Sequence, residues 1–155
     1  MPAKEGGENQ LMDHEIAYIK MRDENPDFIR ALMSSDAMTI PPRLNDDGSV
    51  ERAEESGPLF SVSEKTGDLH MRYTARTRSI AWKDGELVKQ AVSFLEQLLD
   101  SDSPYIFRGT LQPGMGLVSN NVLHDRSGFT DDENSQRLLY RARYFDRIKD
   151  TGIGC

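Results

Sequence analysis

Cysteine is nearly absent from this chain of 155 residues, because its single example, Cys155, stands at the very end. One thiol excludes an internal disulfide framework and indicates a reducing compartment. No apolar run approaches the roughly 18 residues of a membrane-spanning helix, and the N-terminus lacks a charged-then-apolar signal. We therefore expect a soluble, cytoplasmic protein without a membrane partner.

Basic residues are also too few for a nucleic-acid-binding surface. Lys and Arg number 19 against 26 Asp and Glu, which gives a formal net charge of −7. This balance argues against nonspecific binding to nucleic acid, because phosphates require a basic face. The length suffices for one domain, while a hydrophobic content of 37% argues against a large dry core.

The most informative pattern that is present is a strict alternation near the C-terminus, which predicts a strand over residues 137–145. Its natural core face carries Leu138, Tyr140, Ala142 and Tyr144, and its other face carries Arg137, Leu139, Arg141, Arg143 and Phe145. Two interpretations of the arginine face stay open. It is either a solvated outer face or an arginine pair lining a cavity, where a guanidinium fork holds a carboxylate through two hydrogen bonds.

A turn and a lone histidine precede this strand. Pro113-Gly114 suits the centre of a type II turn, with glycine supplying the positive φ. Asn120-Asn121 tolerate left-handed turn geometry. His124 follows directly, at the start of a predicted strand.

These segments resemble the C-terminal end of the TauD/TfdA-like (taurine dioxygenase) family, which includes the clavaminate-synthase-like branch of Fe(II)- and 2-oxoglutarate-dependent oxygenases. The resemblance implies that His124 is the distal iron ligand. It also implies that Arg137 or Arg141 binds the 2-oxoglutarate carboxylate, and the sequence does not decide between the two. The matching segments are Asn120-Asn121-Val122-Leu123-His124-Asp125-Arg126, Phe129-Thr130-Asp131 and Arg137-Leu138-Leu139-Tyr140-Arg141.

The resemblance further implies a dioxygenase that couples hydroxylation of a small molecule to decarboxylation of 2-oxoglutarate. The iron site of such an enzyme needs two histidines and one carboxylate, and in this family the first two ligands stand as His-x-Asp or His-x-Glu. The chain has only His14, His70 and His124, and none of them begins that motif. We therefore expect a truncated or partial oxygenase, with residues 1–149 as the C-terminal part of the domain and residues 150–155 as a tail.

Two alternatives accompany this expectation: one chain of a split oxygenase, or a non-catalytic relative that binds a carboxylate. The expected substrate is a small molecule, and an anionic one is among the alternatives because Arg72, Arg76 and Arg78 form a local basic patch. An incomplete fold would leave strand edges unpaired, so we also expect either a homo-oligomer or a partner chain.

The expected fold class is α+β, a partial double-stranded β-helix (jelly-roll) with flanking helices. Helices are predicted between Asp13 and Asn25, over 27–33 and over 86–99, and strands over 9–12, 37–40, 59–62, 69–73 and 105–111. Residues 43–57 are charged and rich in turn formers, and predict a long loop that is either disordered or plainly solvated. The family resemblance implies a further alternative, a lid over the substrate site. His14 and His70 are expected to be exposed.

Overall fold

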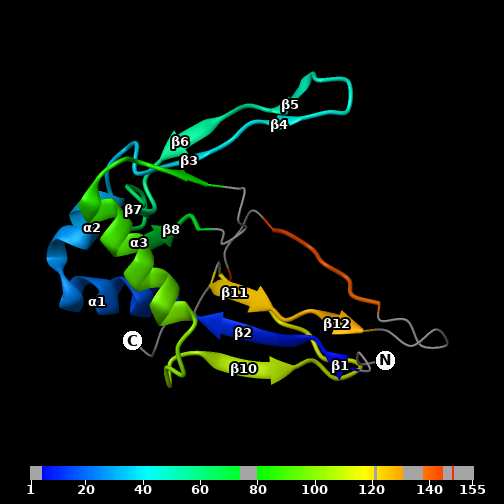
Figure 1. Ribbon diagram of the computed structural model, residues 1–155. Helices are drawn as coiled ribbons and strands as arrows, with labels where there is room; N and C mark the ends of the chain where they lie inside the picture. Colours follow the sequence, from blue (N-terminus) through cyan, green and yellow to red (C-terminus); the bar gives the residue numbers. More distant parts are fainter. Residues whose placement is uncertain (1–4, 74–79, 121, 131–137, 145–147, 149–155) are drawn as a thin grey trace. The chain divides into compact units, whose positions relative to one another are not determined.

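The computed structural model describes residues 5–73, 80–120, 122–130, 138–144 and 148 (Figure 1). Its helices and small antiparallel sheets confirm the α+β class. The chain divides into two compact units. The sheet unit comprises residues 1–12 and 104–155, and the helical unit comprises Asp13–Ser103.

The sheet unit is built on three antiparallel strands. β2 (Glu8–Met12) lies between β10 (Phe107–Thr110) and β11 (Leu123–Arg126), as Figure 1 shows. The strands predicted over 9–12 and 105–111 are therefore confirmed. The central strand comes from the N-terminal end of the chain and both of its neighbours from the C-terminal third, so this sheet depends on pairing between distant segments.

A second strand pair also joins an N-terminal segment to a C-terminal one, and it requires glycine. β1 (Glu5–Gly6) pairs with β12 (Phe129–Thr130). Gly6 has φ +76°, and a Cβ there would stand 2.1 Å from the carbonyl oxygen of Gly128. The backbone N–H of Gly7 donates to that same oxygen at 3.1 Å. Only a residue without a side chain allows this close approach.

The predicted type II turn at Pro113-Gly114 is supported by its backbone geometry. Gly114 has φ +83°, and the N–H of Met115 donates to the carbonyl oxygen of Gln112 at 3.0 Å. That hydrogen bond spans four residues, as a β-turn requires.

Two helices open the helical unit, and each begins at a side-chain cap. α1 (His14–Glu24) follows Asp13, whose carboxylate accepts a first-turn backbone N–H at 2.9 Å. α2 (Pro26–Leu32) follows Asn25, whose side-chain oxygen accepts an N–H at 3.0 Å. Proline at the first helical position costs nothing, since its N–H would have no partner in the helix. Both predicted helices are confirmed to within a residue or two.

α3 (Glu86–Leu99) has the predicted bounds. Its apolar stripe packs against α2, and the rings of Phe28 and Phe94 meet with centroids 6.1 Å apart. The stripe is therefore core. Its buried members are Val88, Ala91, Val92 and Leu95.

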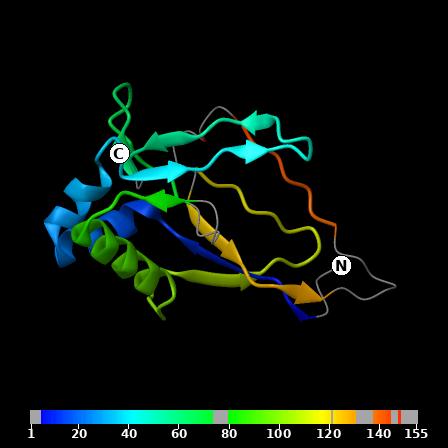
Figure 2. The same ribbon diagram turned by 45° about the horizontal axis from the view of Figure 1, so that its top comes forward.

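Three short strands of the helical unit form a small sheet, which a hairpin extends. β3 (Met38–Ile40) pairs with β6 (Glu55–Gly57) and with β9 (Ala81–Trp82). Beyond them, β4 (Arg43–Leu44) pairs with β5 (Val50–Arg52), and the cyan and teal strands of Figure 2 show this hairpin continuing β3 and β6.

The loop predicted over residues 43–57 is therefore wrong. The turn residues do form a tight turn, in which Asn45 N–H donates to the carbonyl oxygen of Ser49 at 2.8 Å. The flanking charged residues, however, pair as strands, and Arg43 and Glu51 form an ion pair of 2.7 Å. Because every side chain of β4 and β5 is exposed, the two strands show no alternation of polar and apolar residues that would identify them in the sequence.

The predicted hairpin of residues 59–62 and 69–73 is confirmed as β7 (Phe60–Val62) and β8 (Leu69–Met71). Phe60 is fully buried and meets the ring of Tyr18 edge-on at 5.4 Å. The hairpin thus completes the core of the helical unit beneath α1.

The predicted strand over 137–145 is not found in its described part, residues 138–144. No strand pairs with these residues in the described chain. The expected core side chains are open to solvent, with Tyr140 88% and Tyr144 84% exposed. Alternation shows only that a segment is able to lie in a sheet, and a ladder also needs a neighbour. The predicted tail, 150–155, lies outside the described residues.

Candidate functional site

His124 is the second residue of β11, and its side chain is exposed. Its Nδ1 lies 3.0 Å from the carbonyl oxygen of Val122. Since a carbonyl only accepts, this contact suits the tautomer with the proton on Nδ1 and leaves a lone pair on Nε2. Histidines that bind metals usually donate their other ring N–H in this way. His124 therefore fits the role of a metal ligand through Nε2.

The sheet register determines which side chains share a face with His124. Leu11 of β2 is opposite Phe107 on one side and His124 on the other. Residues directly opposite in an antiparallel pair point to the same face, so these three form one row. The next row on that face consists of Asn9, Gly109 and Arg126.

A cavity of about 340 Å³ opens beside β10. A Cβ on Gly109 would stand 3.1 Å from the ring of Phe107, which shows that this ring lies over the glycine. The cavity is mainly apolar, and its size is that of a small-molecule pocket. Its lining is Asn9, Phe107, Gly109, Thr110, Leu111, Met115, Gly116 and Leu117.

Of the two arginines expected to bind a carboxylate, Arg141 lies in the extended segment 138–144 and Arg137 lies outside the described residues. Arg141 is exposed and belongs to the sheet unit, as His124 does. Within the described part of the chain its guanidinium makes no hydrogen bond or ion pair with another side chain.

Asn120 has a role that the sequence did not suggest. Its side-chain Nδ2 donates to the carbonyl oxygen of Ile148 at 3.0 Å, and its Oδ1 accepts the Ile148 N–H at 2.9 Å. The sequence indicates Asn120 as a turn former and as part of the segment that resembles the family, but not as a partner of Ile148. The signal in the sequence is weak, because any Asn has one donor and one acceptor end.

Residues 1–143 match the family described as "Taurine catabolism dioxygenase TauD, TfdA family". The chain belongs to this family. A similar protein is the uridine-5'-phosphate dioxygenase of Amycolatopsis sp., which is 31% identical over 151 residues. The match covers 92% of this chain and 51% of that relative, so the chain spans about half the relative's length.

For a TauD-family chain, the two other histidines need to be considered as metal ligands. His14 was expected to be exposed, and this is wrong, because it is only 5% exposed and its Nε2 donates to the carbonyl oxygen of Leu69 at 3.0 Å. The first turn of α1 packs against β8, which buries the ring. His70 on β8 is exposed, as predicted.

No group of three or more His, Cys, Asp or Glu side chains in the described residues is arranged to hold a metal ion. His124 lies in the segment whose sequence resembles the family, and its Nδ1 is 3.0 Å from the carbonyl oxygen of Val122. None of the described helices has the length and apolar character needed to cross a membrane.

The basic patch expected from three arginines is described only at Arg72, since Arg76 and Arg78 lie outside the described residues. Arg72 Nη1 donates to a carboxylate oxygen of Glu55 at 2.7 Å, and Nη2 lies 3.3 Å from the carbonyl oxygen of the same residue. This arginine connects the end of β8 to β6. Its engagement with Glu55 argues for a structural role.

Three titratable groups of the helical unit have shifted pKa values, and each shift has a structural cause. Side-chain and backbone hydrogen bonds from Ser49 lower the pKa of Asp47. Hydrogen bonds from Lys83 and Ser34 lower the pKa of Asp36. Burial, followed by the charge of Glu96, raises the pKa of Tyr73. None of these three groups lines either of the two described cavities, so the shifts give no reason to place an acid–base pair there.

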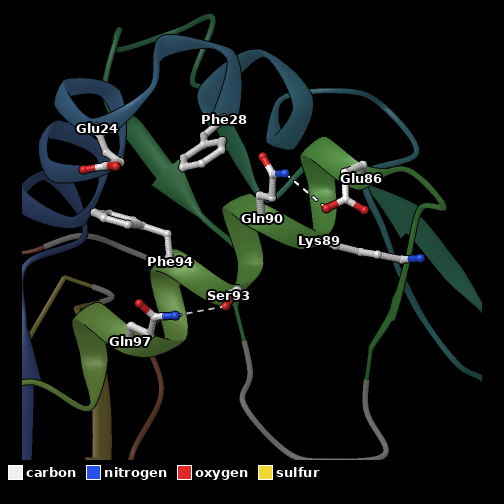
Figure 3. Close-up of a pocket in the computed structure, with 8 residues that line it drawn as sticks. All are labelled: Glu24, Phe28, Glu86, Lys89, Gln90, Ser93, Phe94 and Gln97. Carbon is white, nitrogen blue, oxygen red and sulfur yellow. Dashed lines mark hydrogen bonds between the residues drawn. The ribbon is translucent and has the colours of Figure 1, made fainter.

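A groove of about 480 Å³ runs between α2 and α3 in the helical unit (Figure 3). Its floor is formed by Phe28 and Phe94. Its rim is polar, and two of the rim amides are engaged along α3, Gln90 with Glu86 and Gln97 with Ser93. The groove contains no histidine, and it shows no feature of the family's chemistry.

Proposed function

We propose that this chain supplies part of the Fe(II) and 2-oxoglutarate site of a dioxygenase that hydroxylates a small molecule. The observation that carries the proposal is the Nδ1 contact of His124, which leaves Nε2 available within a TauD-family motif. His124 would bind the iron, and Arg141 or Arg137 would bind the carboxylate of 2-oxoglutarate. When bound, iron and 2-oxoglutarate supply the oxidising chemistry.

The residues of this chain would bind 2-oxoglutarate and the substrate and would orient them. A guanidinium holds a carboxylate through two parallel hydrogen bonds, which fixes both its position and its direction. The apolar cavity beside Phe107, on the same sheet face as His124, would limit access of water to the substrate. We also propose that the sheet unit is part of a jelly-roll, since an antiparallel sheet with the site residues on one face agrees with that fold.

The remaining iron ligands must come from elsewhere. The 155 residues contain no His-x-Asp or His-x-Glu. In this proposal the first histidine and the carboxylate are supplied by residues outside this sequence, either in the same polypeptide or in a partner chain of a split enzyme. The exposed apolar side chains of the sheet unit, including Leu138 and Tyr140, would suit such a partner or a second copy.

The proposed substrate is a small anionic molecule. This is supported by the similar protein, whose name states that it acts on uridine 5'-phosphate. A nucleoside monophosphate is therefore the first substrate class to test. The single cysteine supports a cytoplasmic location.

A second candidate is a non-catalytic protein that binds a carboxylate without iron. It is favoured by the free guanidinium of Arg141 in the described chain and by the missing His-x-Asp motif. The two candidates differ in metal dependence, because a carboxylate bound by arginine alone does not need iron.

Calorimetric titration of the 155-residue protein with 2-oxoglutarate, under anaerobic conditions with and without Mn(II), tests both. Binding that needs the metal and is lost in His124→Ala supports the oxygenase site. Arg141→Ala or Arg137→Ala should weaken it by about tenfold or more, the worth of a charge-assisted pair. His70→Ala, an exposed histidine of the other unit, is the matched control. Metal-independent binding supports the second candidate, and no binding by the folded protein contradicts both.

A further inference from the structure

The side chain of Asn120 forms a two-bond pair with the backbone of Ile148, 28 residues later. One bond uses the amide donor and the other uses the amide oxygen, at 3.0 and 2.9 Å. The backbone N–H and carbonyl of Ile148 are thus bonded as they would be to a neighbouring antiparallel strand, but the partner is a side-chain amide. Both polar ends of the amide are satisfied at once, so the pair holds Asn120 in one orientation.

The contact closes a loop of the chain, and all the proposed site residues lie within that loop. His124 is four residues after Asn120, and Arg141 is seven residues before Ile148. Arg137 lies between them. The chain advances at most about 3.3–3.6 Å per residue, so pinning the two ends of the loop restricts how far the arginines can move from the histidine.

The near half of this loop has its own anchors. β11 pairs with β2, and β12 pairs with β1. The far half contains residues 138–144, which belong to no strand in the described chain and have exposed side chains. The pair between Asn120 and Ile148 is therefore the described contact that holds the far half, where Arg141 lies.

We propose that Asn120 is a positioning residue, which ties the arginine-bearing segment, through the backbone of Ile148, to the part of the chain that leads into the His124 strand. The positioning role rests on the proposed function. The contact between Asn120 and Ile148 can be tested independently of that function. Asn120 is not proposed to touch iron, 2-oxoglutarate or substrate. It would act through Arg141 or Arg137 by limiting the positions that their backbone adopts.

The first test measures amide hydrogen exchange by NMR. In Asn120→Ala the Ile148 amide should exchange about tenfold faster, because the hydrogen bond that protects it is lost. The matched control is Asn45→Ala, which removes an exposed asparagine bonded to Ser49 in the helical unit. That change should leave Ile148 unaffected. Equal exchange at Ile148 in the wild type and Asn120→Ala overturns the proposal.

The second test is a double-mutant cycle on 2-oxoglutarate affinity, measured by calorimetry with Mn(II). Asn120→Ala should weaken binding several-fold in the wild-type background and have no further effect once the carboxylate-binding arginine is replaced. Arg141→Ala and Arg137→Ala serve as the two backgrounds. Equal weakening in all backgrounds would mean a general structural effect and would overturn the positioning role.

Failure of the proposed function has a different signature. A wild-type protein that binds no 2-oxoglutarate contradicts the site and the purpose given to Asn120. The exchange rate of Ile148 would then still report whether Asn120 holds the C-terminal segment.

Discussion

His14 Nε2 donates to the carbonyl oxygen of Leu69 at 3.0 Å, which joins the first turn of α1 to β8 across 55 residues of sequence. The ring is 5% exposed. Its other nitrogen, Nδ1, has no hydrogen-bond partner among the described residues and lies 3.6 Å from a carboxylate oxygen of Asp13. His14 is thus a structural residue of the helical unit.

Replacing His14 by Ala should destabilise the protein by about 1–3 kcal/mol, because the partly buried carbonyl of Leu69 loses its donor and the buried ring leaves a cavity. Urea denaturation followed by circular dichroism measures the change. His70→Ala, at the exposed position next to Leu69, should change stability by less than about 0.5 kcal/mol. Equal effects of the two changes would contradict the burial of His14.

Gly6 and Gly48 both have positive φ, but only Gly6 faces a neighbour. A Cβ at Gly6 would stand 2.1 Å from the Gly128 oxygen, whereas a Cβ at Gly48 would meet nothing within 4 Å. Gly48→Ala should therefore cost only the conformational strain, about 1–2 kcal/mol. Gly6→Ala should cost more and should also separate β1 from β12.

Denaturant unfolding and amide exchange of the Gly7 N–H, which donates to Gly128, distinguish the two substitutions. Gly7 should exchange faster only in Gly6→Ala. If Gly48→Ala proves the more harmful, the close approach of β1 and residue 128 is wrong.

Local signals in the sequence were sufficient for the helices. Asp13 and Asn25 predict caps, and residues 86–99 carry an apolar stripe that defines α3. Features that depend on distant partners were missed. The burial of His14 is decided by β8, 55 residues away, and no pattern in β4 and β5 reveals that these charged segments pair with each other.

The features of the candidate site also fall into two groups, those that a local sequence signal predicts and those that depend on distant residues. His124 and its strand follow from a local motif, and the structure adds the Val122 contact that sets the ring tautomer. Arg141 was placed in a strand on alternation alone, and the described chain gives that strand no neighbour. The contact of Asn120 with Ile148 spans 28 residues, beyond the range of any local signal.

Side chains of α3 differ in burial, so replacing leucine by alanine should cost different amounts of stability at different positions of this helix. Leu95 is fully buried and Leu87 is 37% exposed. Leu95→Ala should cost about 2–5 kcal/mol, from lost burial and the cavity left behind. Leu87→Ala in the same helix should cost clearly less, since much of its surface already meets water. The difference in urea midpoint between the two variants is the measurement, and equal midpoints would contradict the packing of α3.

Asp36 and Lys83 form an ion pair of 2.8 Å. This pair predicts that the stability of the folded protein decreases at acid pH. Hydrogen bonds from Lys83 and Ser34 lower the pKa of Asp36 below 3.8 in the folded protein. The folded pKa is below the unfolded one, so the stability from this group is present above pH 3.8 and is lost as pH falls through the lowered folded value.

Lys83→Met should raise the pKa of Asp36 towards its ordinary value, because the largest cause of the shift is removed. Carboxyl carbon NMR during an acid titration measures it. The pKa of Asp47 is also lowered, but by Ser49, so its titration should not change in this variant. A shift of both groups would indicate a general unfolding effect instead of the loss of one contact.

The tautomer of His124 is the prediction closest to the proposed chemistry. Its Nδ1 lies 3.0 Å from the Val122 carbonyl oxygen, so the neutral ring should carry its proton on Nδ1. Neutral histidine in water usually favours the proton on Nε2, and a carbonyl at Nδ1 reverses this preference. Long-range nitrogen–proton NMR in alkaline buffer distinguishes the two forms of the neutral ring. Exposed His70 serves as the comparison in the same spectrum. A predominant Nε2–H form at His124 would occupy the atom proposed to bind iron, and the Val122 contact could then not prepare the ring for a metal.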